Sequence, residues 1–169
     1  VVSSCKRVIK MSIQQRAVSK SFHRKGTYFF TLCTADRKPL FGTVENWLSG
    51  PYWRPHAAGT AVAAMLERIG RTRRDIELTD FVVMPNHIHL IVTLKNGDSR
   101  TIGWFVTYCR GILEKQTAID LVISAKDSLV EELHTDLAFR TARLSLELHH
   151  QYWQYDRLYV AETPSAYGK

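Results

Sequence analysis

Cysteine is scarce in this chain. Only three cysteines, Cys5, Cys33 and Cys109, occur among 169 residues, and they are widely separated and odd in number. No two of them form the CxxC pair that many zinc sites and redox motifs use, and their spacing gives no disulfide framework. We therefore expect them to be small apolar fillers or exposed thiols rather than metal ligands.

Long apolar runs are also missing. No stretch approaches the roughly 20 apolar residues of a membrane-spanning helix. The first residues, VVSSCKRVIKMSIQQR, are basic and lack the apolar core of a signal peptide. These absences predict a cytoplasmic protein with no membrane partner. Internal repeats and low-complexity tracts are absent too, so we expect a basic arm over residues 1–25 and a single domain over 26–169.

Positive charge, in contrast, is plentiful. The formal net charge is +7 and the isoelectric point is about 9.5, which favours a polyanionic partner, nucleic acid first. Four arginines crowd the end of an expected helix, where the helix dipole favours cations; their number exceeds what capping needs, so contact with phosphate is a second interpretation. The candidate DNA-binding residues are Arg68, Arg71, Arg73, Arg74, Arg110 and Lys115.

Hydrophobic periodicity predicts an α+β chain. Alternating β-branched and aromatic residues predict strands over 26–34, 76–84 and 87–94, and a helical period predicts helices over 57–72 and 101–117. Residues 47–55 are interpreted as a loop and 128–150 as helical, with Ser128 and Glu131 at the spacing of a capping box. The pattern over 118–126 is ambiguous, with DLVIS as a candidate short strand. We expect one antiparallel sheet with helices packed on one face.

The most informative stretch is TDFVVMPNHIHLIVTL, residues 79–94. Two apolar runs flank the turn signal Pro85-Asn86, so two strands joined by a tight connection are expected. His87 and His89 stand at i and i+2 of the second strand, which places both imidazoles on one face, about 6–7 Å apart along it. Such a pair on a rigid strand is half of a metal site; the alternative is the polar face of an ordinary alternating strand.

The residues MPNHIHLIV resemble the His-hydrophobic-His (HUH) signature of single-tyrosine transposases, and YFFTLCTADRKPLF upstream resembles the first strand and loop of that family. The resemblance implies a ferredoxin-like sandwich in which the two histidines bind Mg²⁺ or Mn²⁺. It further implies nicking and rejoining of single-stranded or hairpin DNA through a 5′-phosphotyrosine intermediate. Relatives of the REP-associated branch, which this chain resembles more, look monomeric, whereas insertion-sequence relatives are homodimers.

The C-terminal sequence YVAETPSAYG, which begins at Tyr159, is similar to the segment YIxxNPxxAG that carries the catalytic tyrosine in the REP-associated branch. The resemblance implies that Tyr159 is the nucleophile and that a polar residue one turn later completes the metal shell. Thr163 stands where the family has Asn, and Glu162 is its possible replacement. The expected metal ligands are therefore His87, His89, Glu162 and Thr163.

A second alignment competes with this one. Trp153-Gln154 and Tyr155-Asp156 are similar to the family segment WQxxYYDH, which normally lies well before the catalytic tyrosine. In that register the tyrosine falls beyond Lys169 and the chain is truncated or inactive. Tyr167 and Tyr155 are further candidates, and a non-catalytic nucleic-acid-binding domain of the same fold is the alternative function. A zinc hydrolase is disfavoured, because no HExxH motif accompanies the pair.

The remaining aromatic residues and histidines favour structural interpretations. Trp47, Tyr52 and Trp53 could stack on nucleic-acid bases, but aromatic residues in a loop more often anchor it to the core, which we prefer. The histidines of the expected C-terminal helix are interpreted as solvated polar residues: His134, His149 and His150.

Overall fold

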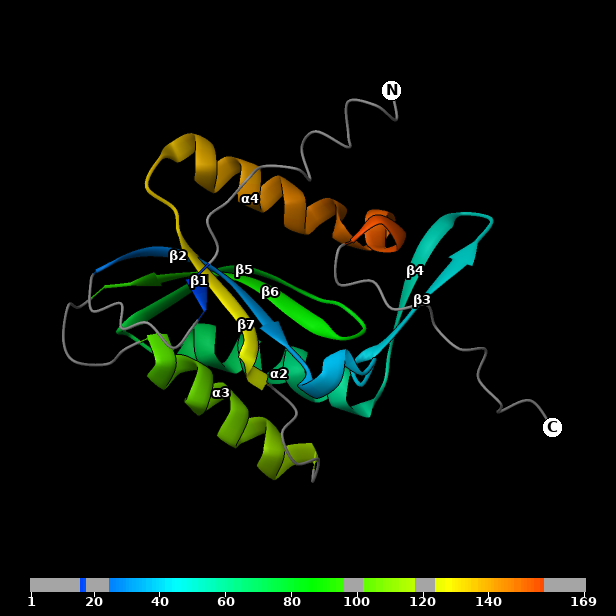
Figure 1. Cartoon of the computed structure of the whole chain (residues 1–169), viewed down its shortest axis with the longest axis horizontal. Coiled ribbons are helices and arrows are strands. Elements are labelled where there is room, and N and C mark those ends of the chain that lie inside the picture. The colour runs from blue at the N-terminus through cyan, green and yellow to red at the C-terminus, as the bar shows by residue number, and fades with distance from the viewer. Residues whose placement is uncertain (1–15, 18–24, 96–101, 118–123, 157–169) are drawn as a thin grey trace.

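The computed structural model of the chain describes residues 16–17, 25–95, 102–117 and 124–156 (Figure 1). Its elements are, in chain order, β1 (Arg16–Ala17), β2 (Gly26–Cys33), the 3-10 helix η1 (Ala35–Arg37), β3 (Gly42–Trp47), β4 (Gly50–Pro55), α2 (Ala57–Thr72), β5 (Ile76–Val83), β6 (His87–Leu94), α3 (Ile102–Thr117), β7 (Ser124–Glu132), α4 (Asp136–Leu148) and the 3-10 helix η2 (His149–Tyr155).

Five strands form one antiparallel sheet in the order β1-β7-β2-β6-β5, and β3 and β4 form a separate hairpin. Strands β2 and β6 are well inside the sheet, as their aromatic and β-branched residues predict. Their register pairs Thr31 with His89 and Cys33 with His87. Paired residues in antiparallel strands share a face, so β2 contributes side chains directly opposite the two histidines.

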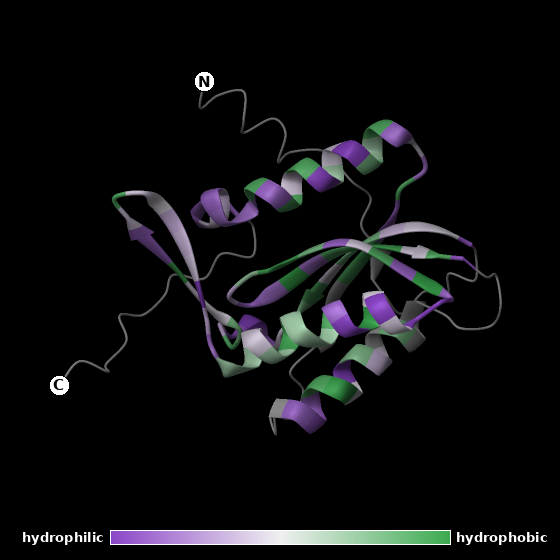
Figure 2. Cartoon of the chain, turned by 180° about the vertical axis from the view of Figure 1, so that it is seen from behind, coloured by the Kyte–Doolittle hydropathy of each residue, from purple (hydrophilic) through white to green (hydrophobic). Residues whose placement is uncertain are grey.

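The larger core lies between one face of the sheet and helices α2 and α3. Phe30 and Leu90 from the central strands pack there with Leu66 of α2 and Phe105 of α3, all fully or almost fully buried. Burying one such side chain stabilises the fold by about 1.5–3 kcal/mol. Figure 2 shows that polar and apolar residues alternate along these helices, which is the pattern of an element that buries a single stripe.

The opposite face of the sheet is covered by α4 and η2 (Figure 1). Leu146 of α4 and Trp153 of η2 pack here against Met84 and Ile91, which border or lie in β6. The α+β class, the antiparallel sheet and the helices expected over 57–72 and 101–117 are confirmed. Helix α4 adds a layer on this second face, and that layer encloses the two histidines.

The prediction of a helix beginning near Ser128 is wrong. Residues 124–132 form β7, which inserts between β1 and β2 in the sheet. Pairing on both edges satisfies the backbone of this segment and overrides its weak helical periodicity. The helix begins at Asp136, and the hydroxyl of Thr135 caps it by accepting a hydrogen bond from the N–H of Ala138 at 3.1 Å.

The prediction of a loop over 47–55 is also wrong for most of this segment, which forms β4 and the turn of a hairpin. Gly50 occupies the turn with φ of +112°, a conformation that glycine adopts without strain. Within the described residues, no helix is long and apolar enough to span a membrane. Most of the expected basic arm lies outside the described residues, and the expected division at residue 25 remains a prediction.

Candidate metal centre

His87 and His89 open β6 and project from one face of the sheet, with ring centroids 4.5 Å apart. Ile88 between them points into the larger core on the other face. Both imidazoles are buried, because the layer formed by α4 and η2 lies over them. The side-chain alternation expected from the sequence is thus confirmed.

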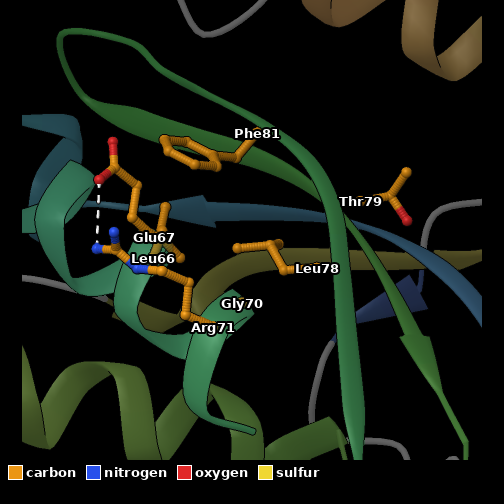
Figure 3. A pocket seen from close by; sticks show the side chains of 7 residues that line it. All are labelled: Leu66, Glu67, Gly70, Arg71, Leu78, Thr79 and Phe81. Carbon is orange, nitrogen blue, oxygen red and sulfur yellow. Dashed lines mark ion pairs between the residues drawn. The ribbon is translucent and has the colours of Figure 1, made fainter. Parts of the chain in front are cut away.

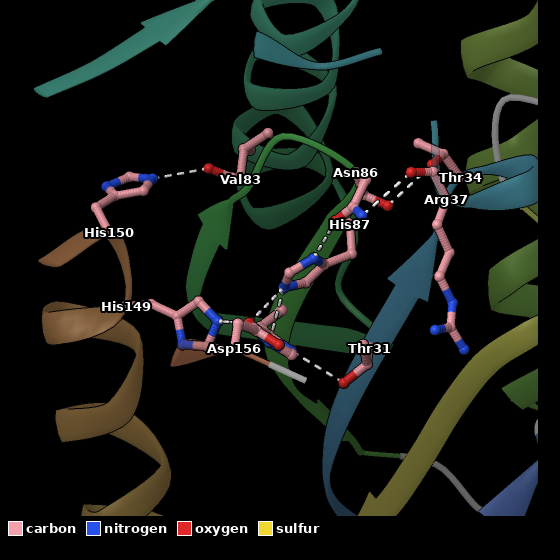
Figure 4. A network of polar contacts seen from close by, with 10 residues as sticks. Thr31, Thr34, Arg37, Val83, Asn86, His87, His149, His150 and Asp156 are labelled. Atoms are coloured by element: carbon pink, nitrogen blue, oxygen red, sulfur yellow. Dashed lines mark hydrogen bonds and ion pairs between the residues drawn. The ribbon is translucent and has the colours of Figure 1, made fainter. Parts of the chain in front are cut away.

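The turn before the pair is fixed by hydrogen bonds to the segment after β2. The backbone N–H and the hydroxyl of Thr34 both donate to the carbonyl of Asn86, at 2.9 and 3.0 Å. The side-chain amide of Asn86 donates in turn to the carbonyl of Arg37 at 3.2 Å. Asn86 therefore has little freedom, and its Oδ1 lies 2.8 Å from Nδ1 of His87 (Figure 4).

Both histidines are oriented through Nδ1. The Oδ1 atom of Asn86 accepts from Nδ1–H of His87, and the Thr31 hydroxyl lies 2.9 Å from Nδ1 of His89. The two Nε2 atoms then face each other at 3.1 Å. A neutral imidazole protonated on Nδ1 has a lone pair on Nε2, and two lone pairs at this distance repel unless a proton or a cation lies between them. Outer hydrogen bonds of this kind are typical of metal-binding histidines.

His149, the first residue of η2, and Asp156, which directly follows η2, complete the cluster. Oδ2 of Asp156 lies 2.6 Å from Nε2 of His149 and 3.4 Å from Nε2 of His87. The ligand-capable atoms of all four residues lie within 4.8 Å of one another. Figure 4 shows the imidazoles of His149 and His87 converging on the carboxylate of Asp156.

The cluster holds Asp156 ionised. Burial acts to raise the pKa of this carboxyl. When protons rather than a metal occupy Nε2 of His149 and His87, the hydrogen bonds and positive charge of these imidazoles outweigh burial, so the pKa of Asp156 lies well below its ordinary value. Trp153 lies beside His87, with ring centroids 5.7 Å apart. A mostly buried carboxylate surrounded by histidines attracts a cation.

The donor set fits a divalent transition metal. Three imidazole nitrogens and one carboxylate oxygen suit Zn²⁺ or Mn²⁺ better than Mg²⁺, which prefers oxygen ligands. Tetrahedral ligands at about 2.1 Å from an ion stand roughly 3.4 Å apart, and the contacts of 3.1 and 3.4 Å within the cluster are of that size. His87, His89, His149 and Asp156 could therefore hold a metal ion.

Comparison with solved structures finds a related architecture. A REP-associated tyrosine transposase bound to a REP hairpin superimposes with a TM-score of 0.54, at 17% sequence identity, over 77% of this chain and 70% of that one. The two chains share a fold.

Sequence comparisons add little. No protein-family model matches the chain. An uncharacterized protein of Haemophilus influenzae is 28% identical over 74 residues, a match that spans 44% of this chain and 39% of that protein. The chain thus spans well under half of the length of this relative. The match therefore assigns no activity of the relative to this chain.

Two of the four groups in the cluster were not expected from the sequence. His149 was interpreted as solvated, and that interpretation is wrong, because its side chain lies in the cluster. Asp156 belongs to the segment similar to WQxxYYDH, but that similarity bears only on the placement of the catalytic tyrosine and gives Asp156 no role as a ligand. The expected ligands Glu162 and Thr163 and the tyrosines Tyr159 and Tyr167 lie outside the described residues. Tyr155 ends η2, and its side chain likewise lies outside the described part of the chain.

The other two histidines of the C-terminal part have different surroundings. His150 points away from the cluster: its Nε2–H donates to the carbonyl of Val83 at 2.8 Å, and its ring stacks on Trp53 with centroids 5.3 Å apart. Burial lowers its pKa, so the neutral form that donates this bond is favoured. His134 is exposed, as expected.

The six basic residues expected to bind DNA lie elsewhere. Arg68, Arg71, Arg73 and Arg74 lie on α2 or just after it, and Arg110 and Lys115 on α3, in the helix layer on the opposite face of the sheet from the cluster. Three of them contact carboxylates: Arg73 with Asp75 at 2.6 Å, Arg110 with Glu114 at 2.7 Å, and Arg71 with Glu67 at 3.7 Å. Their contact with DNA remains a prediction.

An open pocket of about 330 Å³ lies between α2 and β5, on the same face as these arginines (Figure 3). Leu66, Leu78 and Phe81 form its apolar floor, and the ion pair of Glu67 and Arg71 lies at its rim. This pocket lacks a group of metal-capable side chains. The histidine cluster is therefore the stronger candidate for chemistry in the described part of the chain.

Proposed function

We propose that this chain is a metal-dependent transposase or endonuclease that nicks and rejoins single-stranded hairpin DNA, of the HUH single-tyrosine type and nearer its REP-associated branch. The observation that carries the proposal is the convergence of His149 and Asp156 on the His87–His89 pair. An ordinary strand with a polar face would not bury two imidazoles, orient both through Nδ1 and bring a carboxylate to within 3.4 Å of Nε2 of His87. The shared fold with a REP-associated tyrosine transposase supports the same conclusion.

Mn²⁺ or Mg²⁺ held by the cluster would polarise the scissile phosphate and orient it for in-line attack. The chain's own residues do the rest. Asn86 and Thr31 hold the imidazoles in position, and the buried ring of Trp153 lies beside that of His87. A tyrosine oxygen attacks phosphorus, the bond from phosphorus to the 3′ oxygen breaks, and the departing strand keeps a 3′ hydroxyl after it takes up a proton. The reverse attack by a 3′ hydroxyl reseals the strand without another energy source.

Tyr159 is the proposed nucleophile. Tyr159 follows Asp156 by three residues in the sequence, and three residues span about 10 Å at most when extended. The phenol has an ordinary pKa of about 10 and needs activation by its surroundings. The competing proposals are Tyr167, Tyr155 and a tyrosine absent from this chain, in which case the domain binds nucleic acid without cutting it.

The test is a covalent adduct. Wild-type protein with Mn²⁺ and labelled single-stranded hairpin DNA should give a protein band that carries the DNA label in denaturing gels. Tyr159→Phe keeps the ring and loses the attacking oxygen, so it should abolish the band and leave hairpin binding intact. Tyr167→Phe is the matched control. If the band survives in Tyr159→Phe and disappears in Tyr167→Phe or Tyr155→Phe, the register is wrong; binding without any adduct favours the non-catalytic alternative.

A further inference from the structure

The hairpin of β3 and β4 has two faces with different roles. Its register pairs Val44 with Trp53 on one face and Glu45 with Tyr52 on the other, and Trp47 follows two residues after Glu45. Val44 and Trp53 pack against the cores of the domain. Trp47 and Tyr52 therefore share the face that points away from the body of the protein.

The outward face is aromatic and exposed. Trp47 is 64% exposed and Tyr52 is 55% exposed, with ring centroids 6.4 Å apart, and Leu48 at the turn is completely exposed. The interpretation that these aromatic residues anchor the segment holds for Trp53 alone. Trp47, Leu48 and Tyr52 lie close together on a two-stranded projection, and a contiguous exposed apolar patch of this kind is typical of an interaction site.

The hairpin contacts a residue next to the candidate metal centre. Trp53 stacks on His150 at an interplanar angle of 9°, and His150 directly follows His149 of the cluster. Figure 1 shows β3 and β4 running past η2 and projecting beyond the sheet. Trp47 lies three residues beyond the pair of Val44 and Trp53, about 10 Å along the strand. Nucleotides that extend from the cluster along the hairpin would reach the end that carries Trp47.

We propose that Trp47 and Tyr52 form a stacking platform for unpaired bases of single-stranded DNA that extends from the metal centre. This inference rests on the proposed function, in which a DNA strand lies at the cluster. Stacking on aromatic rings accepts any base, since every base has a π-face. The charged side chains of the hairpin, Glu45 and Arg54, pair at 3.1 Å, so no uncompensated acidic group faces the phosphates.

A protein partner fits the platform less well. The exposed surface of Trp47, Leu48 and Tyr52 amounts to at most about 500 Å², whereas a stable protein interface buries about 800 Å² on each side. One base needs a single ring face, so two rings suffice for one or two nucleotides. The size of the aromatic surface therefore favours DNA bases over a second copy of this chain.

The test compares ring removal with removal of a neighbouring apolar side chain. Binding of a fluorescent single-stranded oligothymidine would be followed by anisotropy, with and without Mn²⁺, for Trp47→Ala, Tyr52→Ala and Leu48→Ala. Each ring variant should weaken binding about 5- to 150-fold, the range measured for loss of one stacked base. Trp47→Phe should keep most of the affinity, and Leu48→Ala should match the wild type. Because no charge changes, the salt dependence of binding should stay the same in all variants.

An abasic oligonucleotide of the same length supplies the second arm. It has the phosphates without the bases, so wild type and ring variants should bind it equally. A deficit that persists on the abasic strand, an equal loss in Leu48→Ala, or unchanged affinity in both ring variants overturns the proposal. Loss of affinity that follows dissociation of a dimer would overturn it in favour of self-association. Binding is measured without nicking, so a failure here is distinct from a failure to form the phosphotyrosine adduct.

Discussion

Removal of His149 is the sharpest test of the metal centre, because the sequence alone assigned this residue to solvent. A metal that binds the folded chain alone stabilises it by about 2.7 kcal/mol when its free concentration is 100 times Kd. For a domain of this size, each kcal/mol raises Tm by about 2–4 °C, so the wild type should gain roughly 5–11 °C with Mn²⁺. Mg²⁺ should give a smaller shift, because three of the four groups are imidazoles.

His149→Ala takes one of four ligand groups from the cluster. If affinity falls by about 100-fold, the same Mn²⁺ concentration equals Kd and contributes only about 0.4 kcal/mol, or roughly 1 °C in Tm. The variant also removes the hydrogen bond to Asp156 at 2.6 Å, so its melting temperature without metal will change. The informative quantity is therefore the difference in Tm with Mn²⁺ and with a chelator, measured for each protein by calorimetry.

His134→Ala is the matched control, because that histidine has a side chain that is 73% exposed and lies outside the cluster. It should keep the full wild-type shift. The reasoning is refuted if Mn²⁺ leaves the wild-type melting curve unchanged, or if His149→Ala retains the whole shift. In the second case the ion would be held by the His87–His89 pair and by groups other than His149.

Three further outcomes are expected. Thr31→Val removes the hydroxyl that orients the second histidine of the pair, so Mn²⁺ affinity measured by calorimetric titration should fall about 10- to 100-fold; Thr27→Val on the same strand should not change it. Arg68 and Arg74 are exposed, and replacing both by Gln should make hairpin-DNA binding less sensitive to salt. The slope of log affinity against log salt concentration should fall by about 0.7–0.9 for each phosphate that the variant no longer neutralises. An unchanged slope would show that these two arginines do not contact the DNA. Burial raises the pKa of Cys109 to about 12, so alkylation at pH 8, mapped by mass spectrometry, should reach this thiol only after unfolding.

Local patterns in the sequence determined much of the fold. Alternation of apolar residues around His87 and His89 specified a strand with both imidazoles on one face, because side chains on a strand alternate whatever the strand packs against. The period of Val62, Leu66 and Ile69 specified α2 in the same way, and the structure places all three in the core. These inferences succeeded because they depend on near neighbours in the chain.

Pairing with distant strands decided what local patterns could not. Ser128 and Glu131 have the spacing of a helix cap, yet β7 takes this segment into the sheet because β1 and β2 offer it backbone partners on both edges. The hairpin was missed for a related reason: its two strands are short, and only the pairing of Val44 with Trp53 shows which aromatic residues are anchored and which are exposed.

The candidate site itself shows where sequence information ends. His149 has the pattern of a solvated helix residue, and nothing local distinguishes it from His134. Its position is set by packing: Leu146 and Trp153 seat α4 and η2 on Met84 and Ile91, and this seating carries His149 and Asp156 over β6. The sequence by itself determined the strand and the two imidazoles it presents; the tertiary structure alone decided which groups meet them, because that depends on hydrophobic contacts between segments far apart in the chain.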